Sequence, residues 1–312
     1  MNIINFSKYI KHRSLYYIMA ESPNFITTFL MGGLGNQMFQ IFALIACAKK
    51  TSRPYVLKYS EILTTGVHRP TYWKTIFSKI KTDHFIGANS VIPVNSQAIV
   101  HVTIQEAGFN YDISLEPKLA NFNNENVCLY GYFQSYKYFE QYFDKIVAEL
   151  GIREKQALYA VPINTMSNVS LHFRIGDYAE KQGYHPVLPL TYYINAINHI
   201  ISTIYTNVFR VLYFFEEQDE DKINISIRVL SKKYPSITFL PCSTKMKDWE
   251  QMLIMSNCQH NIIANSSFSW WGAYLNPNSS KIVCYPELWF GPKMGPVYME
   301  DLFPPSWAKI PL

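Results

Sequence analysis

The sequence predicts an α/β protein with two Rossmann-like lobes, each built on a parallel sheet, and a cleft between them. The chain has 312 residues, enough for two domains of ordinary size. Its second half alternates unbroken apolar runs with helical segments, which is typical of parallel strands covered on both faces. Its first half opens with an apolar run, a glycine-rich turn and an apolar helix, the start of another strand–helix unit.

We expect a loosely structured leader over residues 1–23, an N-terminal lobe over 24–160, and a C-terminal lobe over 161–312 whose last segment packs back on the first lobe. The leader lacks a long uncharged apolar core, so it resembles neither a signal peptide nor a membrane anchor. No other stretch reaches about 18 uncharged apolar residues. We therefore expect no transmembrane segment.

The elements of the N-terminal lobe are predicted as a strand over 24–31, a tight turn over 32–37, an apolar helix over 38–50, a strand over 54–59 and an amphipathic helix over 137–151. Two lysines close the first helix, where its dipole favours positive charge. Residues 60–130 give no clear assignment. Residues 152–168 are expected to form a connector.

The C-terminal lobe has a more regular pattern of apolar runs. Strands are predicted over 169–175, 210–215, 236–240, 261–265 and 281–285. Helices are predicted between them, over 190–205, 221–234, 248–258 and 268–275. Because ligands in such sheets bind at the carboxyl ends of the strands, the residues that follow each strand are the candidates for function.

Net charge and cysteine content limit the possible binding partners and the cellular compartment. The net charge is +5, and the basic residues are scattered, so a polyanionic small molecule is as good a partner as any polymer and we expect no nucleic acid. The five cysteines are far apart and form no CxxC pair. Most lie in apolar runs, as expected for core thiols in a reducing compartment, so we expect a cytoplasmic protein.

The turn GGLGNQ (32–37) lies between a predicted strand and a predicted helix. Glycines there let a ligand approach the backbone, and the helix N-terminus can hold an anion. Asn36 and Gln37 add amide donors at the same turn. Position 38 is Met, so the third glycine of a dinucleotide fingerprint is absent and a nicotinamide cofactor is disfavoured. A tight turn with an Asn cap is the alternative interpretation.

The stretch HFRIGDY (172–178) ends a predicted strand. Period two places Ser170, His172 and Arg174 on one face of that strand. Arg is well suited to bidentate contact with phosphate, and Asp177 could orient Arg174, cap the next element or take a proton. A purely structural Arg–Asp pair is the alternative.

The stretch NSSFSWWGAYL (265–275) places hydroxyl groups at a strand-to-helix turn. Backbone N–H groups are unpaired there and the helix dipole favours an anion, so Ser266 and Ser267 are candidates for a diphosphate site. Trp270 and Trp271 are interpreted as core residues that fix the turn. An N-cap serine with no ligand is the alternative.

Asp219 and Asp221 form a D-x-D pair after a buried strand, and such pairs hold a divalent metal in some sugar transferases. Acidic residues are also favoured at the start of the helix that follows, and we prefer that interpretation. The sequence has no His/Cys cluster typical of zinc and no G-x-S-x-G elbow typical of a hydrolase.

Together with GYFQSYKYF (131–139), the stretches GGLGNQMFQ, HFRIGDY and NIIANSSFSWWGAYL closely resemble the α-1,2-fucosyltransferase family, glycosyltransferase family 11. The resemblance extends from about residue 28 to about residue 308. It implies a GT-B-like fold and transfer of L-fucose from GDP-fucose to the 2-hydroxyl of a galactose-type sugar. It further implies inversion at the anomeric carbon, with no metal or other cofactor required.

The resemblance also implies roles for single residues. Arg174 would hold the β-phosphate and be catalytic, His172 would lie near guanine, and the Ser266–Ser267 turn would bind the pyrophosphate. The resemblance does not identify the catalytic base; Asp177 is our first candidate, and deprotonation by the departing phosphate is the alternative. The implied donor-binding set is Gly33, Gly35, Asn36, Gln37, His172, Arg174, Glu250, Gln251, Asn265, Ser266, Ser267 and Phe268.

The chain departs from the family pattern at two places. Ile175 replaces the second Arg of the motif, and period two points it to the apolar face of the strand. Gln251 stands where the family usually begins a helix with Asp; Glu250 is adjacent and Asp248 is nearby. Gln251 can accept one hydrogen bond from guanine but without charge assistance, whereas Glu250 could replace the Asp only if the helix start is shifted.

The acceptor is expected to be a galactose-containing oligosaccharide. Residues 60–130 would shape its site, with His68, Tyr72 and Trp73 as sugar-stacking groups, although ordinary packing also explains these aromatics. A peripheral membrane contact through a lipid-linked glycan stays open. Two other functions compete: a metal-dependent glycosyltransferase using Asp219 and Asp221, and a non-catalytic nucleotide-sugar-binding protein.

Overall fold

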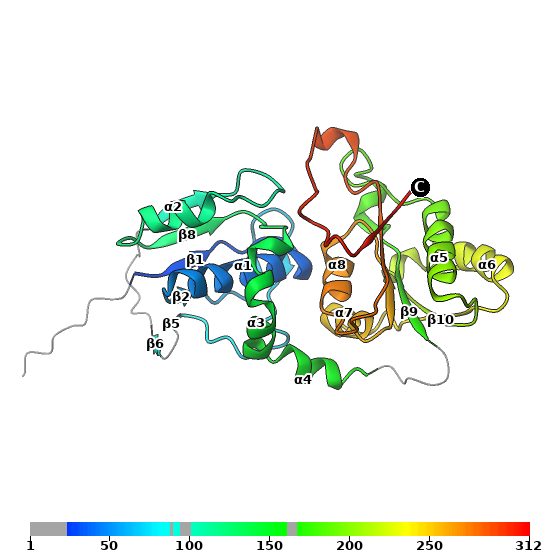
Figure 1. Ribbon diagram of the computed structural model, residues 1–312, viewed down its shortest axis with the longest axis horizontal. Helices are drawn as coiled ribbons and strands as arrows, with labels where there is room; N and C mark the ends of the chain where they lie inside the picture. Colours follow the sequence, from blue (N-terminus) through cyan, green and yellow to red (C-terminus); the bar gives the residue numbers. More distant parts are fainter. Residues whose placement is uncertain (1–23, 88–89, 94–100, 161–166) are drawn as a thin grey trace, which may run out of the picture.

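The computed structural model describes residues 24–87, 90–93, 101–160 and 167–312. Two α/β lobes lie next to each other along the long axis of the molecule, the first coloured blue to green and the second green to red (Figure 1). The expected leader over 1–23 lies outside the described residues, as does most of the segment at the expected lobe boundary (161–166). The predicted GT-B-like arrangement of two Rossmann-like lobes is confirmed.

The first lobe contains a six-stranded sheet in the order β6-β5-β2-β1-β8-β7. Its strands are β1 (Ile26–Thr28), β2 (Tyr55–Val56), β5 (His84–Ile86), β6 (Val91–Pro93), β7 (Val102–Gln105) and β8 (Val127–Tyr130). β2, β1, β8 and β7 are parallel, but β5 is antiparallel to both of its neighbours, β2 and β6, so this sheet is mixed rather than parallel as predicted. Only four positions separate β5 from β6, and so short a connection joins only antiparallel strands.

The helices of the first lobe are α1 (Leu34–Thr51), α2 (Leu115–Asn121), α3 (Phe143–Leu150) and α4 (Ile152–Ala157), and a separate hairpin is formed by β3 (Ile62–Leu63) and β4 (Arg69–Pro70). α1 begins inside the predicted turn, because Gly32 makes the turn alone with a φ of +78°. The predicted helix over 137–151 starts with two short 3₁₀ turns, Tyr136–Tyr138 and Glu140–Tyr142, before α3. The predicted connector begins with α4.

The second lobe contains a six-stranded, wholly parallel sheet in the order β11-β10-β9-β12-β13-β14. Its strands are β9 (Asn168–His172), β10 (Arg210–Phe214), β11 (Thr238–Pro241), β12 (His260–Ile262), β13 (Val283–Pro286) and β14 (Ala308–Ile310). Its helices are α5 (Leu190–Ile204), α6 (Glu220–Lys233), α7 (Asp248–Ser256) and α8 (Ser267–Tyr274). All predicted strands and α-helices of this lobe are present, and among its described strands β14 was not predicted.

A shared aromatic core joins the lobes where α8 lies beside α1 (Figure 1). Trp270 and Trp271 are fully buried, as predicted. The Trp271 ring stacks on Phe139 of the first lobe, with centroids 5.3 Å apart, and also lies 4.6 Å from the Phe42 ring. The backbones meet at Gly35, because a Cβ there would lie 2.4 Å from the carbonyl carbon of Ser267.

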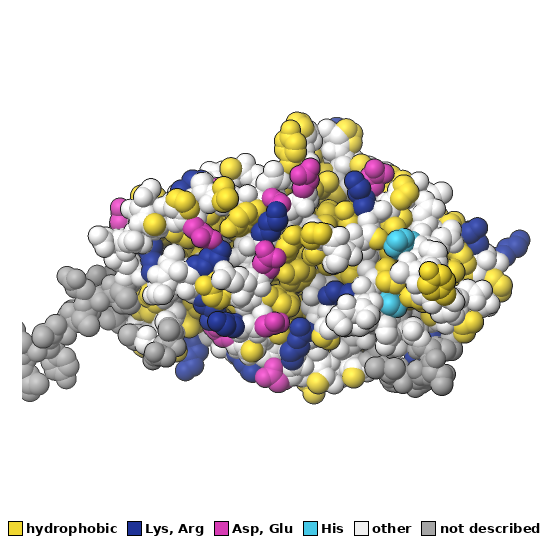
Figure 2. Space-filling model, in the orientation of Figure 1, with side chains coloured by type: hydrophobic (Ala, Val, Ile, Leu, Met, Phe, Trp, Pro, Cys, Tyr) yellow, Lys and Arg dark blue, Asp and Glu magenta, His cyan; other side chains and the backbone are white. Residues whose placement is uncertain are grey.

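The segment before β14 also touches the first lobe. The backbone N–H of Tyr111 donates to the Asp301 carboxylate at 3.1 Å, and the Ser135 hydroxyl donates to the Asp301 carbonyl at 2.8 Å. β14 then returns the chain to the second sheet. On the face drawn in Figure 2, basic and acidic side chains are interspersed. Across the described ranges, no helix combines the length and apolar character that a membrane span requires.

Candidate active site

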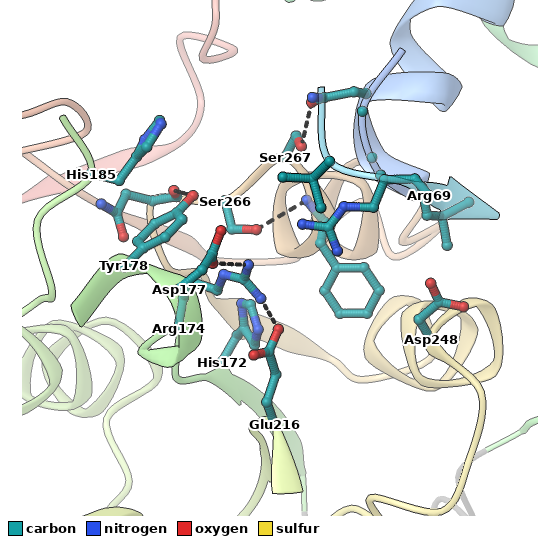
Figure 3. Close-up of a pocket in the computed structure, with 18 of the residues that line it drawn as sticks. Arg69, His172, Arg174, Asp177, Tyr178, His185, Glu216, Asp248, Ser266 and Ser267 are labelled. Carbon is teal, nitrogen blue, oxygen red and sulfur yellow. Dashed lines mark hydrogen bonds and ion pairs between the residues drawn. The ribbon is translucent and has the colours of Figure 1, made fainter. Parts of the chain in front are cut away.

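A cavity of about 750 Å³ lies between the lobes and is lined by residues of both. The residues that line it include Gly33, Asn36, Arg69, Tyr72 and Gln134 from the first lobe and His172, Arg174, Asp177, Asp248, Ser266 and Ser267 from the second. Figure 3 shows Arg174, His172 and Ser266 near the middle of the close-up. The structure thus brings the three motifs identified in the sequence to one place.

Two helices begin at this cavity. α1 has Gly33 as its N-cap and no side-chain cap, whereas in α8 the N-cap Ser266 hydroxyl accepts a hydrogen bond from Phe268 N–H at 3.3 Å. Asn36 links the two starts, since its Oδ1 accepts hydrogen bonds from the Ser267 hydroxyl at 2.8 Å and from Gln134 Nε2 at 2.9 Å. Two helix N-termini at one cavity make a site suited to an anion.

Arg174 is the main cation of the second lobe at this site. Its guanidinium forms an ion pair with Glu216 and a second with Asp177, whose Oδ1 lies 2.5 Å away, and it lies over the Tyr178 ring at 4.9 Å. Burial lowers the pKa of Arg174, but the nearby Glu216, Tyr178 and Asp177 outweigh this effect and the net pKa is raised. Arg174 therefore stays charged.

His172 is buried and its ring centroid lies 5.4 Å from that of Phe268. Burial, with a further contribution from the Arg174 charge, lowers the pKa of His172 to about 3, so the imidazole is neutral at neutral pH. Among the described residues, His172 Nδ1, Arg174 Nε and Asn265 Oδ1 are buried without a hydrogen-bond partner. Unpartnered buried polar atoms are uncommon, and three at one cavity indicate a place for a ligand.

The contacts at the start of α7 show which of Asp248, Glu250 and Gln251 face the cavity. Asp248 and Gln251, three positions apart on one helix face, both line the cavity. The Tyr72 hydroxyl donates to the Asp248 carboxylate, and Gln251 Nε2 donates to the Met246 carbonyl at 3.0 Å. Glu250 does not line the cavity; it accepts hydrogen bonds from Lys247 N–H and from the Tyr159 hydroxyl, each at 2.8 Å. The carboxylate at this edge of the cavity is therefore Asp248, not the predicted Glu250.

Three of the predicted donor-binding residues make contacts that hold the backbone around the cavity in place. Gln37 is buried, and its Nε2 donates to the carbonyls of Gly32 at 3.0 Å and Pro70 at 2.9 Å. Asn265 Nδ2 donates to the carbonyls of Pro186 at 2.9 Å and Trp289 at 3.2 Å. Gly35 lines the cavity, and its lack of a side chain also lets the backbone of α8 approach.

The predicted acceptor residues are not brought together. Only Tyr72 lines the cavity. His68 is exposed outside its lining, and Trp73 faces a different pocket and donates from Nε1 to the Ser60 carbonyl at 3.0 Å. The three residues lie in a stretch with no clear secondary-structure pattern. The sequence alone therefore could not distinguish the residue that lines the cavity from the two that do not.

The two residues of the D-x-D pair have different environments. Asp219 is buried and its Oδ2 accepts a hydrogen bond from Gly176 N–H at 2.7 Å, which fixes the turn that carries Asp177. Asp221 is exposed in the first turn of α6, as the helix-start interpretation predicted. Within the part of the chain that the structure describes, no group of three or more His, Cys, Asp or Glu side chains is arranged to hold a metal.

The two remaining residues of interest are Ile175, which departs from the family pattern, and Arg69. Ile175 packs against the apolar cluster of the second lobe, as period two predicted. Arg69, in β4, lines the cavity with no carboxylate within ion-pair distance among the described residues, and sequence analysis missed it. The only signal was a basic residue in HRPTYW (68–73), inside the stretch that could not be assigned.

Comparison with known proteins places the chain among sugar transferases. The model of the family "Glycosyl transferase family 11" matches residues 13–310. An Escherichia coli O-antigen biosynthesis glycosyltransferase is 28% identical over 84% of this chain and 93% of its own. An Escherichia coli α-1,2-colitosyltransferase is 26% identical over 90% of this chain and 97% of its own. A galactoside 2-α-L-fucosyltransferase of Caenorhabditis elegans is 22% identical over 99% of this chain and 85% of its own.

Proposed function

The chain belongs to glycosyl transferase family 11, and from this premise we propose that it is an inverting, metal-independent galactoside α-1,2-L-fucosyltransferase. The donor would be GDP-fucose and the acceptor the 2-hydroxyl of a terminal galactose-type sugar in a glycan. The observation that carries the proposal is the convergence of Arg174 and two helix N-termini on one cavity.

The chemistry needs such a site. Breaking the bond between fucose and the β-phosphate leaves positive charge on the sugar ring and negative charge on the departing phosphate. Arg174, the hydroxyl of Ser266 and the N–H groups at the starts of α1 and α8 are fixed in place before the reaction, and Ser267, whose hydroxyl donates to Asn36, holds the two helix starts together. Preorganised donors of this kind stabilise the departing phosphate and supply what a metal ion supplies elsewhere.

The guanine base would lie near His172, Phe268 and α7. The neutral His172 offers an unpartnered Nδ1, and the ring of Phe268 lies beside it. Asp248 would accept hydrogen bonds from the N–H groups on the guanine edge, with the charge assistance that Gln251 lacks. Asp248, one helical turn before Gln251, would thereby supply the carboxylate that the family pattern places at position 251.

Asp177 would take the proton from the acceptor hydroxyl. Its Oδ1 binds Arg174 at 2.5 Å, and its Oδ2 lies 3.6 Å from Lys181 Nζ. The side chain keeps an exposed fraction of 38%, so an acceptor can reach it. A carboxylate in hydrogen-bond reach of the reacting hydroxyl is sufficient for general-base assistance.

The relative named as a colitosyltransferase supports a second candidate, the same reaction with colitose in place of fucose. The relative named for O-antigen biosynthesis supports an acceptor glycan of that kind, and a peripheral membrane contact through a lipid-linked acceptor would follow from it. A cytoplasmic location is part of the proposal, supported by five free cysteines.

The test is GDP release from GDP-fucose and from GDP-colitose, with and without lactose, each with and without EDTA. Acceptor-stimulated release that resists EDTA supports the proposal, and the preferred donor decides between the two sugars. Release abolished by EDTA would overturn metal independence and return attention to Asp219 and Asp221. GDP binding without any release would indicate a non-catalytic binding protein.

A further inference from the structure

We infer that the acceptor sugar binds at an aromatic subsite made by Phe109, His185 and Phe290, at the end of the cavity opposite Tyr72. This inference rests on the proposed function, since it assigns the two ends of one cavity to donor and acceptor. It replaces the acceptor site expected at His68, Tyr72 and Trp73.

The cavity has two ends, with the anion site between them. In Figure 3, Arg69 and Asp248 lie at one side of the close-up, and Tyr178 and His185 lie at the opposite side. Arg174 and Ser266 lie between the two groups. A nucleotide sugar whose phosphates occupy the middle must therefore extend its base towards one end and its sugar towards the other.

The chemistry of the Asp248 end fits the base. A purine edge carries N–H donors, and this end offers a carboxylate at Asp248 and an amide oxygen at Gln251. Tyr72 donates its hydroxyl to Asp248, so Tyr72 belongs to this end as well. The donor sugar, and the acceptor that attacks it, are thereby directed to the His185 end.

The His185 end has the composition of a sugar subsite. The rings of Phe109 and Phe290 lie 4.9 Å apart, His185 lies 5.8 Å from Phe290, and all three are partly exposed and line the cavity. Aromatic faces take up the apolar C–H face of a pyranose, while a few polar groups orient it. The ring nitrogens of His185 have no hydrogen-bond partner among the described residues, so they can meet a sugar hydroxyl.

The same end holds the proposed base. His185 stacks on Tyr178, with centroids 4.9 Å apart and an interplanar angle of 22°, and Tyr178 follows Asp177 directly. An acceptor seated on the aromatic rings would therefore have its hydroxyl groups close to the only carboxylate that this motif supplies. The proposed base and the aromatic rings therefore lie at the same end of the cavity.

The subsite is held in place from both lobes. Phe109 belongs to the first lobe and Phe290 to the segment after β13. Gly291 N–H donates to the Tyr184 carbonyl at 2.8 Å, next to His185, and a Cβ at Gly291 would lie 2.5 Å from the Gly183 carbonyl oxygen. This close backbone contact fixes the distance between His185 and Phe290.

The test measures binding rather than turnover, so that it is separate from the proposed reaction. Affinity for N-acetyllactosamine in the presence of saturating GDP, and affinity for GDP alone, are measured for wild type, Phe109→Ala, Phe290→Ala and Phe290→Tyr. We expect roughly tenfold weaker galactoside binding for each Ala variant with GDP affinity unchanged within about twofold, and near wild-type binding for Phe290→Tyr, which keeps a ring. Phe109→Ala removes a partly exposed ring from the other lobe, so it stays informative if Phe290→Ala loses stability.

Tyr72→Phe is the matched variant at the other end, and we expect it to change GDP affinity and not galactoside affinity. Weaker GDP binding in both Phe→Ala variants with unchanged galactoside binding would overturn the assignment of the two ends. Failure of the wild type to bind the galactoside would overturn the acceptor class. Tight galactoside binding at this subsite without GDP release from GDP-fucose would uphold the subsite and overturn the proposed reaction alone.

Discussion

The two lobes line one cavity with different kinds of structure. The second lobe presents His172, Arg174 and Ser266 from the ends of parallel strands and from the start of α8. The first lobe contributes the start of α1, the β3–β4 hairpin and irregular loops that carry Phe109 and Gln134. Strand ends hold charged groups at fixed positions, whereas loops vary more easily without disturbing the sheet.

The difference separates two tasks. Groups that must be in place for every turnover, the phosphate ligands, come mainly from the regular lobe. The groups inferred to bind the acceptor come from loops of both lobes, Phe109 from the first and His185 and Phe290 from the second. Variants on either side of the cavity should therefore fail in different ways, and the following predictions test this division.

The largest effect is expected from Arg174→Ala. Removing the guanidinium takes away the main positive charge facing the departing phosphate, so we expect kcat to fall by about 10²–10³-fold, equivalent to about 3–4 kcal/mol of barrier. Arg174→Lys keeps a charge but loses the fork that contacts Glu216 and Asp177 together, and should recover only part of the rate. GDP release measures the effect, with thermal unfolding as the control; a rate within tenfold of wild type would contradict the assignment.

A smaller effect, on stability, is expected from Gly35→Ala. The new methyl group would lie 2.4 Å from the Ser267 carbonyl carbon and 2.6 Å from Phe268 N, so α1 and α8 must separate. We expect a loss of about 3 kcal/mol in the free energy of unfolding, measured in urea. Gly33→Ala is the matched control, because no atom lies within 4 Å of a Cβ there. Equal stability of the two variants would show that the lobes do not depend on this contact.

The smallest effect is expected from Glu106→Gln, and it depends on pH. Glu106 is partly buried beside the loop that carries Tyr132 and Gln134, and it accepts hydrogen bonds from Tyr132 N–H at 2.7 Å and Phe133 N–H at 2.9 Å. Burial, opposed by these bonds, raises its pKa to about 7, above the value in the unfolded chain. The folded state then binds the proton more tightly, so this stabilisation is full below about pH 4.5 and is lost as pH rises through 7.

We therefore expect wild type to lose about 1–2 kcal/mol relative to Glu106→Gln between pH 5 and pH 8, from urea unfolding at each pH. The pH dependence of the difference is the diagnostic quantity, since an uncharged amide does not titrate. A difference that is constant over this range would mean that Glu106 is ionised throughout. It would also mean that the loop carrying Tyr132 and Gln134 is held by the ionised rather than the protonated carboxyl group of Glu106.

Sequence analysis predicted the second lobe well because its strands are unbroken apolar runs of several residues. It missed β14, a strand of three residues (Ala308–Ile310) after an irregular segment. It also failed over residues 60–130, where the strands have two to four residues and too few side chains to show a period.

The site was predictable where a residue's role depends on its neighbours in sequence. His172 and Arg174 share a strand face, and both reach the cavity. The role of Tyr72 depends instead on Asp248, 176 positions away, and only the fold brings the two together. α7 starts at Asp248 as predicted, but the sequence did not show that Asp248 and Gln251, and not Glu250, face the cavity, because that depends on how α7 packs in the fold.

The buried rings between α1 and α8 have a consequence for how substrates enter. Opening the lobes like a clamshell would pull Trp271 away from Phe139 and Phe42 and expose large apolar surfaces to water. We therefore expect the two lobes to move as one rigid body on the side where α1 and α8 meet. We expect the passage of donor and product to depend on small movements of the β3–β4 hairpin at the rim, so that the speed of turnover is set by a few residues rather than by motion of whole domains.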